Sequence, residues 1–269
     1  MAAQPRDDAR DIPDFQALVV FDMKGYSKVP SHSMQTTRDE LDNMLATAFV
    51  ESGLGDEWQH CAYWNDTGDG CILAMPVRRM WRLVEPLPDI LDGILARHDR
   101  ERFNSMPEIR VRMSVHLGPV SENYRGDPIN DACRLIDSDA ARGAVDKAEQ
   151  LGSYVALVIS EAVFQAVVRA RRTIRLTELD FLLTRAEVKD KYSEPAWVYV
   201  PRRSPSALGA PAASSATPDA QPAPGAVVAA SGPPTPATPR TNTIDTVNNY
   251  FDAPQGPLTF TQDFRRTDR

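Results

Sequence analysis

The segment Tyr63–Met75 constrains the fold most, because it predicts a tight hairpin with a carboxylate at its turn. Gly68 and Gly70 supply the backbone freedom that a short connection between two strands needs. The run that follows, Cys71–Met75, is continuously apolar and predicts a buried strand. Asp69 is therefore expected at the rim of a packed sheet, where a lone carboxylate needs a metal ion or a cationic partner. Taken alone, a Gly-Asp-Gly sequence also fits an ordinary turn.

The composition excludes several classes of function. The chain has 269 residues and a net charge of −7 at pH 7, so no broad basic surface for nucleic acid is expected. Its three cysteines lack the spacing of a zinc site, which predicts reduced core thiols at Cys61, Cys71 and Cys133. No run approaches the roughly 20 apolar residues of a membrane helix, and the N-terminal residues lack the apolar core of a signal peptide. We therefore expect a cytoplasmic protein with neither a nucleic-acid nor a membrane partner.

Changes in composition divide the chain into four segments. Residues 1–14 are polar and predict a flexible leader, and residues 15–201 alternate strand-like and helix-like patterns. Residues 202–243 are rich in Pro, Ala, Ser and Thr, which predicts a disordered linker. Residues 244–269 regain apolar side chains and form a short C-terminal segment of unknown role. The sequence thus predicts one folded domain followed by a disordered tail.

The folded region mixes strands, helices and hairpins. Besides the hairpin, strands are predicted at 15–21, 108–116, 154–159, 173–179 and 196–200. Helices are predicted at 37–50, at 80–100 with a break at two prolines, from 130 to 136, and from a Ser160 cap to about 172. This order favours an α+β sheet covered by helices over a doubly wound fold.

Two acidic residues are candidate metal ligands. Asp22 ends the first buried strand, and Asp69 lies at the hairpin turn. Carboxylates on adjacent strand ends can hold two Mg²⁺ or Mn²⁺ ions, which prefer oxygen ligands and substrate phosphates. After Asp22, the backbone N–H groups of Lys24–Ser27 can cradle a polyphosphate. The alternative is that each aspartate caps a local turn.

Three residues further along the chain are candidates for binding substrate. Asn130 and Arg134 are four residues apart and therefore share one helix face. An amide and a guanidinium can together orient a sugar and neutralise charge on a phosphoryl group. The alternative is a helix cap followed by a solvated arginine. Lys189 lies in a short polar loop and has no signal of its own.

Five motifs in this order resemble the class III nucleotidyl cyclase homology domain over about residues 15–200. They are Phe21-Asp-Met-Lys-Gly-Tyr-Ser27, Thr67-Gly-Asp-Gly70, Val111-Arg-Met-Ser-Val-His-Leu-Gly-Pro-Val120, Gly126-Asp-Pro-Ile-Asn-Asp-Ala-Cys-Arg-Leu135 and Val188-Lys-Asp-Lys191. The resemblance implies a ferredoxin-like central mixed sheet covered by helices, in a head-to-tail homodimer with active sites between the subunits.

The same resemblance assigns roles to the candidate residues. It implies that Asp22, Asp69 and the main-chain carbonyl of Met23 bind two divalent cations per site. Asn130 and Arg134 match the pair that stabilises the transition state. Lys189 matches the lysine that contacts the terminal phosphates of a nucleoside triphosphate. Gly25, Tyr26 and Ser27 fall in the loop predicted to cradle the phosphates.

The chain departs from the purine cyclases at two positions that read the base. Asn65 and Asn123 stand where adenylate cyclases of this family have Lys and Asp, and guanylate cyclases place Glu at the first position. An amide both donates and accepts hydrogen bonds, so it can match the edge of uracil or cytosine. The chain therefore looks similar to the bacterial pyrimidine cyclases of Pycsar antiphage systems.

This resemblance implies that UTP is converted to cyclic UMP and pyrophosphate, and that a separate effector protein receives the product. In the implied reaction, the ribose 3′-oxygen attacks the α-phosphate in line. Arg134 stabilises the charge that develops there, and Asn130 aims the ribose. A cytidylate cyclase, a purine cyclase with other base contacts, and a non-catalytic nucleotide-binding dimer stay open as alternatives.

Overall fold

A computed structural model describes residues 12–121, 124, 126–189 and 191–209 of the chain. These residues belong to one compact unit, Met1–Ala216, whereas the second unit, Thr217–Arg269, lies wholly outside the described residues. The predicted leader, the C-terminal segment and most of the predicted linker also lie outside them, and so does Asn123. In the described part of the chain, no helix combines the length and apolar character needed to span a bilayer.

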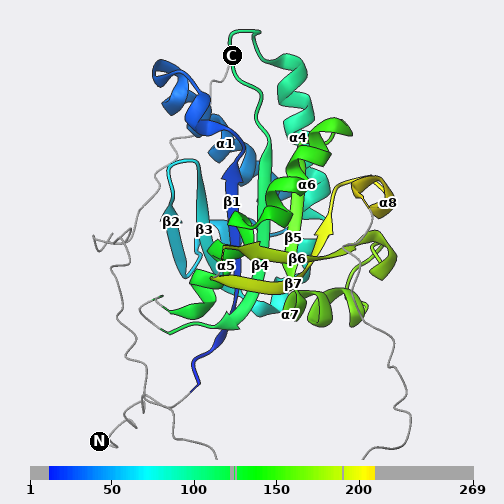
Figure 1. Cartoon of the computed structure of the whole chain (residues 1–269). Coiled ribbons are helices and arrows are strands. Elements are labelled where there is room, and N and C mark those ends of the chain that lie inside the picture. Colours follow the sequence, from blue (N-terminus) through cyan, green and yellow to red (C-terminus); the bar gives the residue numbers. More distant parts are fainter. Residues whose placement is uncertain (1–11, 122–123, 125, 190, 210–269) are drawn as a thin grey trace, which may run out of the picture. The chain divides into compact units, whose positions relative to one another are not determined.

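The described unit is built on one seven-stranded sheet (Figure 1). The strand order is β2-β3-β1-β4-β5-β7-β6. Only the β4–β5 pair is parallel among the described strands, and the other pairs are antiparallel. The strands are β1 (Phe15–Met23), β2 (Tyr63–Asp66), β3 (Gly70–Pro76), β4 (Val111–Pro119), β5 (Val155–Ser160), β6 (Leu182–Val188) and β7 (Tyr192–Tyr199). The predicted mixed sheet is therefore confirmed.

The first four strands have the ferredoxin-like arrangement that the sequence analysis expected. A helix follows β1, the β2–β3 hairpin comes next, and further helices lead to β4. In space, these strands lie in the order β2-β3-β1-β4, so that β1 is central although it comes first in the chain. Strand β1 lies between β3 and β4, and its residues Leu18–Phe21 are almost fully buried.

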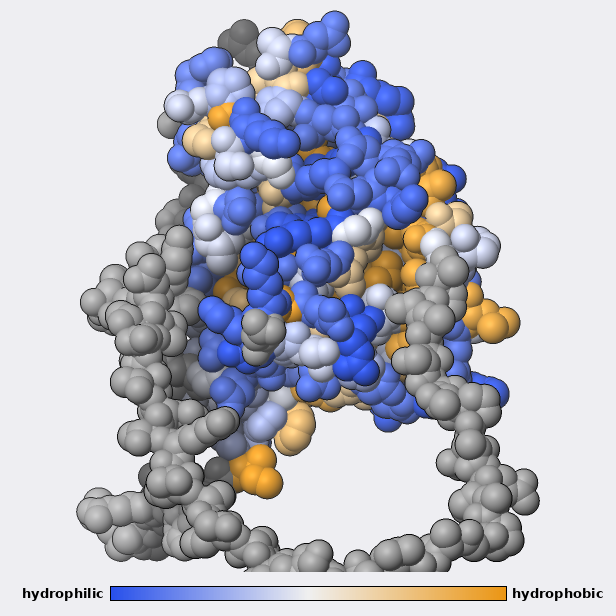
Figure 2. Space-filling model, in the orientation of Figure 1, coloured by the Kyte–Doolittle hydropathy of each residue, from blue (hydrophilic) through white to orange (hydrophobic). Residues whose placement is uncertain are grey.

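Helices cover both faces of the sheet. Alternate residues of β1 point to opposite sides: Val19 and Phe21 pack in the same apolar cluster as α1 and α4, whereas Leu18 and Val20 pack with residues of α5. Helix α6 covers β5 on the α5 side. Figure 2 shows that hydrophilic residues predominate on the face that carries α6.

The helices are α1 (Ser31–Glu51), α2 (Gly55–Gln59), α3 (Trp81–Val84), α4 (Leu87–Glu101), α5 (Asp127–Asp137), α6 (Asp139–Gln150), α7 (Glu161–Val163) and α8 (Pro205–Leu208). Helix α1 begins six residues before the predicted position 37, and α2 and α6 were not predicted. The predicted break lies at Pro86, which separates α3 from α4, whereas Pro88 lies in the first turn of α4. Helix α8 lies within the segment predicted as linker, and its Leu208 is buried against the α6 side of the core.

One predicted strand was wrong. Residues 173–179 are not a strand, because the N–H groups of Ile174, Arg175 and Leu176 donate to the buried carboxylate of Glu85. Ser160, the last residue of β5, lies at the predicted N-cap position of α7, but its side chain makes no cap hydrogen bond; a π-helical segment, Phe164–Arg169, continues from α7. The three cysteines are free thiols as predicted, but only Cys71 is fully buried.

Candidate functional site

The fold brings Asp22 and Asp69 to the same end of the sheet. Asp22 lies opposite Gly70 in the β1–β3 register. The N–H of the next residue, Met23, donates to the carbonyl of Asp69 at 2.9 Å. Gly70 permits this approach, because a Cβ there would lie 1.9 Å from the carbonyl oxygen of Phe21. The two carboxylates that the sequence placed 47 positions apart are thus neighbours.

Arg112, a residue to which the sequence analysis gave no role, contacts Asp22. Its Nε donates to Oδ2 of Asp22 at 2.7 Å, and its Nη2 donates to the same oxygen. The two side chains are each 14% exposed. None of the hydrogen bonds among the described residues uses Oδ1 of Asp22, so Arg112 fixes the carboxylate by one oxygen. No local signal identifies this contact, because it depends on the register between β1 and β4, which places Arg112 opposite Asp22.

The electrostatic environment of Asp22 is unfavourable for its charge. The pKa of Asp22 is raised from the ordinary 3.8 to about 6: burial raises it most, Arg112 opposes the rise, and the nearby Asp69 and Asp137 carboxylates add to it. A carboxylate that is desolvated beside a second carboxylate is stabilised by an additional cation.

This donor set fits a divalent cation. Among the residues that the structure describes, no group of three or more His, Cys, Asp or Glu side chains is arranged to hold a metal ion. Mg²⁺, however, is commonly bound through one or two carboxylates together with substrate phosphates. Asp22 and Asp69 supply two carboxylates, and the backbone of Met23 lies against Asp69.

The loop after β1 has the shape of an anion cradle. Gly25 has φ 74°, in the left-handed region that favours glycine, and it starts a short 3₁₀ turn over Tyr26–Lys28. Within the described residues, the N–H groups of Gly25, Tyr26 and Ser27 donate to no backbone carbonyl. The Tyr26 hydroxyl instead donates to the carbonyl of Met34 on α1 at 3.2 Å, which holds the loop. These three N–H groups are therefore free of backbone partners, and their role as a phosphate cradle stays a prediction.

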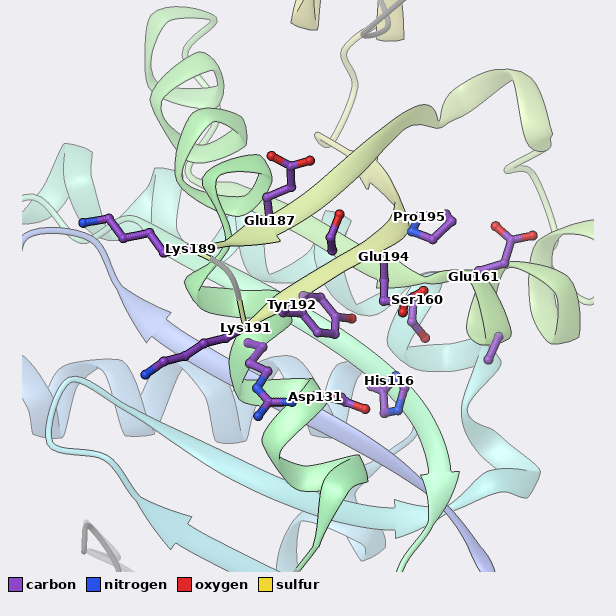
Figure 3. Close-up of a pocket in the computed structure, with 13 residues that line it drawn as sticks. His116, Asp131, Ser160, Glu161, Glu187, Lys189, Lys191, Tyr192, Glu194 and Pro195 are labelled. Carbon is purple, nitrogen blue, oxygen red and sulfur yellow. Dashed lines mark hydrogen bonds and ion pairs between the residues drawn. The ribbon is translucent and has the colours of Figure 1, made fainter. Parts of the chain in front are cut away.

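A different part of the molecule brings Arg134 and Lys189 together. They line a pocket of about 850 Å³ between α5 and the β6–β7 hairpin, together with Asp131 and Tyr192. Figure 3 shows Lys189 and Lys191 at one end of this pocket and Glu161 at the other. Asn130 is exposed on α5, one helical turn before Arg134, and does not line the pocket.

Arg134 is oriented by a neighbour on its own helix. Its Nη1 lies 3.1 Å from Oδ1 of Asp131, three residues earlier. Asp131 also faces Tyr192, and burial together with the nearby Asp131 charge raises the pKa of Tyr192 to about 12. Tyr192 is therefore a neutral hydroxyl beside the Arg134–Asp131 pair at physiological pH. The sequence analysis missed Tyr192 because nothing local distinguishes it from other strand residues.

His116 is a third residue, after Arg112 and Tyr192, to which the sequence analysis gave no role. It lies on β4 on the side of the sheet that α5 covers, and burial lowers its pKa from 6.5. Its Nδ1 is buried and has no hydrogen-bond partner among the described residues. The imidazole is therefore neutral at physiological pH and lines the pocket with an unused polar atom.

The carboxylate pair and the pocket are separate within one chain. Neither Asp22 nor Asp69 is among the residues that line the pocket, and the charged groups that most shift the pKa of Asp22 are Arg112, Asp69 and Asp137. The candidate residues therefore form two separate groups: the carboxylates with the loop after β1, and the pocket that Arg134 and Lys189 line. Asn65 is half-buried on β2, opposite Ile72 on the α5 side of the sheet. Asn123, its predicted partner in base recognition, lies outside the described residues.

Comparison with known proteins gives similarities at the level of solved structures. No protein-family profile matches the chain, and no curated protein does. The chain is similar to the guanylyl cyclase Cya2, with 11% identity and a TM-score of 0.48 over 71% of this chain and 93% of the other. It is also similar to an adenylate/guanylate cyclase/hydrolase from Silicibacter pomeroyi, with 18% identity and a TM-score of 0.47 over 71% and 98%. A third similar structure is the guanylate cyclase domain of RhGC from Catenaria anguillulae in complex with GTP, with 15% identity and a TM-score of 0.46 over 72% and 100%. With TM-scores below 0.5, these similarities assign neither a family nor an activity to the chain.

Proposed function

We propose that the chain is a metal-dependent nucleotide cyclase that converts UTP to 3′,5′-cyclic UMP and pyrophosphate as a head-to-tail homodimer. The observation that carries the proposal is the division of the site. Asp22 and Asp69 converge at one end of the sheet, whereas Arg134 and Lys189 line a separate pocket. A second subunit is needed to bring the two groups to one substrate.

Asp22, Asp69 and the carbonyl of Met23 would hold the two cations, Mg²⁺ or Mn²⁺. Bound divalent cations supply charge neutralisation of the triphosphate and a lowered pKa of the attacking hydroxyl. Arg112 keeps the Asp22 carboxylate fixed through Oδ2 and leaves Oδ1 to a ligand.

The remaining residues bind and orient the substrate. The N–H groups of Gly25, Tyr26 and Ser27 donate hydrogen bonds to phosphate oxygens. Lys189 of the second subunit pairs with the terminal phosphates. Arg134, oriented by Asp131, stabilises the negative charge that develops on the α-phosphate. Asn130, exposed one turn before Arg134, holds the ribose so that its 3′-oxygen faces phosphorus.

The preference for UTP rests on Asn65 and Asn123. An amide can pair with the N3–H and a carbonyl of uracil together, and after an amide flip it can also accept cytosine. Cytidylate cyclase is therefore the second candidate, followed by a purine cyclase and a non-catalytic nucleotide-binding dimer. A role in antiphage defence and a separate effector for the cyclic product follow from the resemblance to the Pycsar cyclases.

A direct test is to incubate the purified full chain with each labelled nucleoside triphosphate and Mn²⁺ and to resolve the products. Cyclic UMP from UTP is the expected result. Cyclic products from ATP or GTP alone would overturn the pyrimidine assignment. No cyclic product from any triphosphate, with binding retained, would favour the non-catalytic dimer.

Complementation tests the division of the site between two subunits. Asp69→Ala and Arg134→Ala should each be inactive as homodimers, because each lacks one half of both sites. A mixture of the two should regain one intact site per heterodimer and thus up to about a quarter of the wild-type activity for random exchange (half of the dimers being mixed, with one of two sites intact). Inactivity of the mixture despite demonstrated subunit exchange would refute the shared site.

A further inference from the structure

A buried arginine on helix α1 contacts the hairpin turn that carries Asp69. Arg38 is 6% exposed and lies on the buried stripe of α1, with Leu41 and Leu45 following it at helical spacing. Arginine is almost never buried to this extent unless its charge is paired. The burial of this guanidinium at a core position of the helix therefore points to specific partners.

The guanidinium of Arg38 joins α1 to the β2–β3 turn. Its Nη2 donates to the carbonyl oxygen of Gly70 at 2.8 Å, across 32 positions of sequence. Its Nη1 donates to the carboxylate of Asp42, one helical turn later on α1, and the carboxylate of Asp66 lies 3.6 Å from Nη2. The two aspartates thus balance the charge of Arg38, whereas the bond to Gly70 fixes the backbone directly after Asp69.

Hydrogen bonds hold the backbone of Asp69 from both sides. The N–H of Met23 donates to the carbonyl of Asp69 at 2.9 Å, and the N–H of Thr67 donates to the carbonyl of Gly70 at 3.1 Å. Arg38 gives that second carbonyl another donor, from α1. Among the hydrogen bonds of the described residues, the carboxylate of Asp69 accepts only one, at 3.4 Å from the Thr67 hydroxyl. The position of this carboxylate therefore depends on the backbone of the turn more than on partners of the side chain.

We propose that Arg38 is a positioning residue of the candidate metal site. Through the carbonyl of Gly70 it holds the hairpin turn against α1, so that the carboxylate of Asp69 stays beside that of Asp22. The inference rests on the proposed function in one respect, namely that these two carboxylates bind a divalent cation. In the described structure Arg38 donates to neither of them, so it acts on the site through the turn.

The charge of Arg38 gives the test a definite sign. Arg38 is a cation near a site for cations, so the removal of its charge alone would tighten the binding of a divalent cation. Loss of its hold on the turn would instead weaken that binding, because two carboxylates must both be at the correct distance from the ion. Destabilisation of the fold alone would leave the affinity of the folded protein unchanged. The direction of the change therefore separates positioning from electrostatics and from a purely structural role.

Titration of the full chain with Mn²⁺, followed by the electron paramagnetic resonance signal of the free ion, measures this direction. Arg38→Met should weaken Mn²⁺ binding about tenfold, the loss expected for one hydrogen bond made by a charged group. Arg38→Lys keeps the charge and one donor for the carbonyl of Gly70, so it should bind Mn²⁺ within about threefold of the wild type.

The matched control is Arg82→Met. Nη1 of Arg82 also donates to a backbone carbonyl, that of Ser52, at 2.7 Å, but it does so just after the C-terminal end of α1. Its removal should change Mn²⁺ binding less than twofold. Hydrogen–deuterium exchange of the hairpin Tyr63–Met75 gives a second readout without metal, and it should be faster in Arg38→Met than in Arg82→Met.

Equal hairpin exchange in the two variants, or Mn²⁺ binding that is unchanged or tighter in Arg38→Met, would overturn the proposal. So would an equal loss of Mn²⁺ affinity in Arg82→Met. A wild-type chain that binds no Mn²⁺ would overturn the proposal together with the metal site. Weakened Mn²⁺ binding in Arg38→Met, in a chain whose wild type makes no cyclic product, would sustain the role of Arg38 and remove the proposed reaction.

Discussion

Replacing Arg112 by methionine should destabilise the folded protein more at pH 8 than at pH 5. Arg112 donates twice to Oδ2 of Asp22 across 90 positions of sequence. Methionine keeps most of the apolar length of the side chain but leaves the Asp22 carboxylate beside Asp69 without the cation that it contacts. An ionised, half-buried carboxylate without a partner is one of the larger single penalties in a folded protein.

The magnitude follows from the environment of Asp22. Its pKa of about 6 exceeds the ordinary 3.8 even with Arg112 in place. Because the native-state pKa lies above the unfolded-state value, ionisation of Asp22 lowers stability as the pH rises from about 4 to about 6. Removing one partner of a buried pair costs about 3–5 kcal/mol. Since these side chains are 14% exposed, we expect a loss of about 2–3 kcal/mol at pH 8, and about 1 kcal/mol at pH 5, where Asp22 is protonated.

Urea unfolding followed by tryptophan fluorescence, at both pH values and one ionic strength, measures the difference. Arg78→Met is the control, because Arg78 is exposed and no ion pair or hydrogen bond of its side chain is found among the described residues. The double variant Asp22→Asn with Arg112→Met should recover stability to within about 1 kcal/mol of the wild type at pH 8, since it removes the unpaired charge. An Arg112→Met loss equal to that of Arg78→Met, or equal at both pH values, would refute the account of Asp22.

Other substitutions test the packing around the two sites. Gly70→Ala should destabilise the chain by about 2–3 kcal/mol and abolish Mn²⁺ binding. The added Cβ would lie 1.9 Å from the carbonyl oxygen of Phe21 and force β1 and β3 apart. Normal Mn²⁺ titration of this variant would contradict the placement of the carboxylates. Gly93→Ala, in α4 with open space around its Cβ, should instead stabilise by up to about 1 kcal/mol in the same urea assay. Phe164→Ala should cost about 3–4 kcal/mol, because the fully buried ring stacks on Trp197 with centroids 3.5 Å apart; a loss below 1 kcal/mol would argue against that packing.

Local patterns correctly predicted much of the scaffold. Apolar runs and turn glycines identified β1 and the β2–β3 hairpin. Both signals depend only on residues that are a few positions apart in the sequence. The convergence of Asp22 and Asp69 was predictable because the β2–β3 hairpin pairs with β1. The register of β3 with β1 places Asp22, near the end of β1, beside Asp69 at the hairpin turn.

Predictions failed where a residue's partner is remote in sequence. Residues 173–179 alternate like a strand, but the carboxylate of Glu85, about 90 positions earlier, accepts their N–H groups. Here a tertiary contact outweighs the local preference.

The sequence by itself determined the α+β class and most of the strands, and it named candidate residues for cations and phosphates. Only the tertiary structure decided that Arg112 fixes Asp22, that Lys24 is held by Asp146 and Glu149, and that Arg134 and Lys189 share a pocket apart from the carboxylates. The physical reason is range. Periodicity and turn chemistry act between residues a few positions apart, whereas these contacts join positions 55 to 125 apart and exist only once the register of the sheet and the packing of α5 and α6 upon it are set.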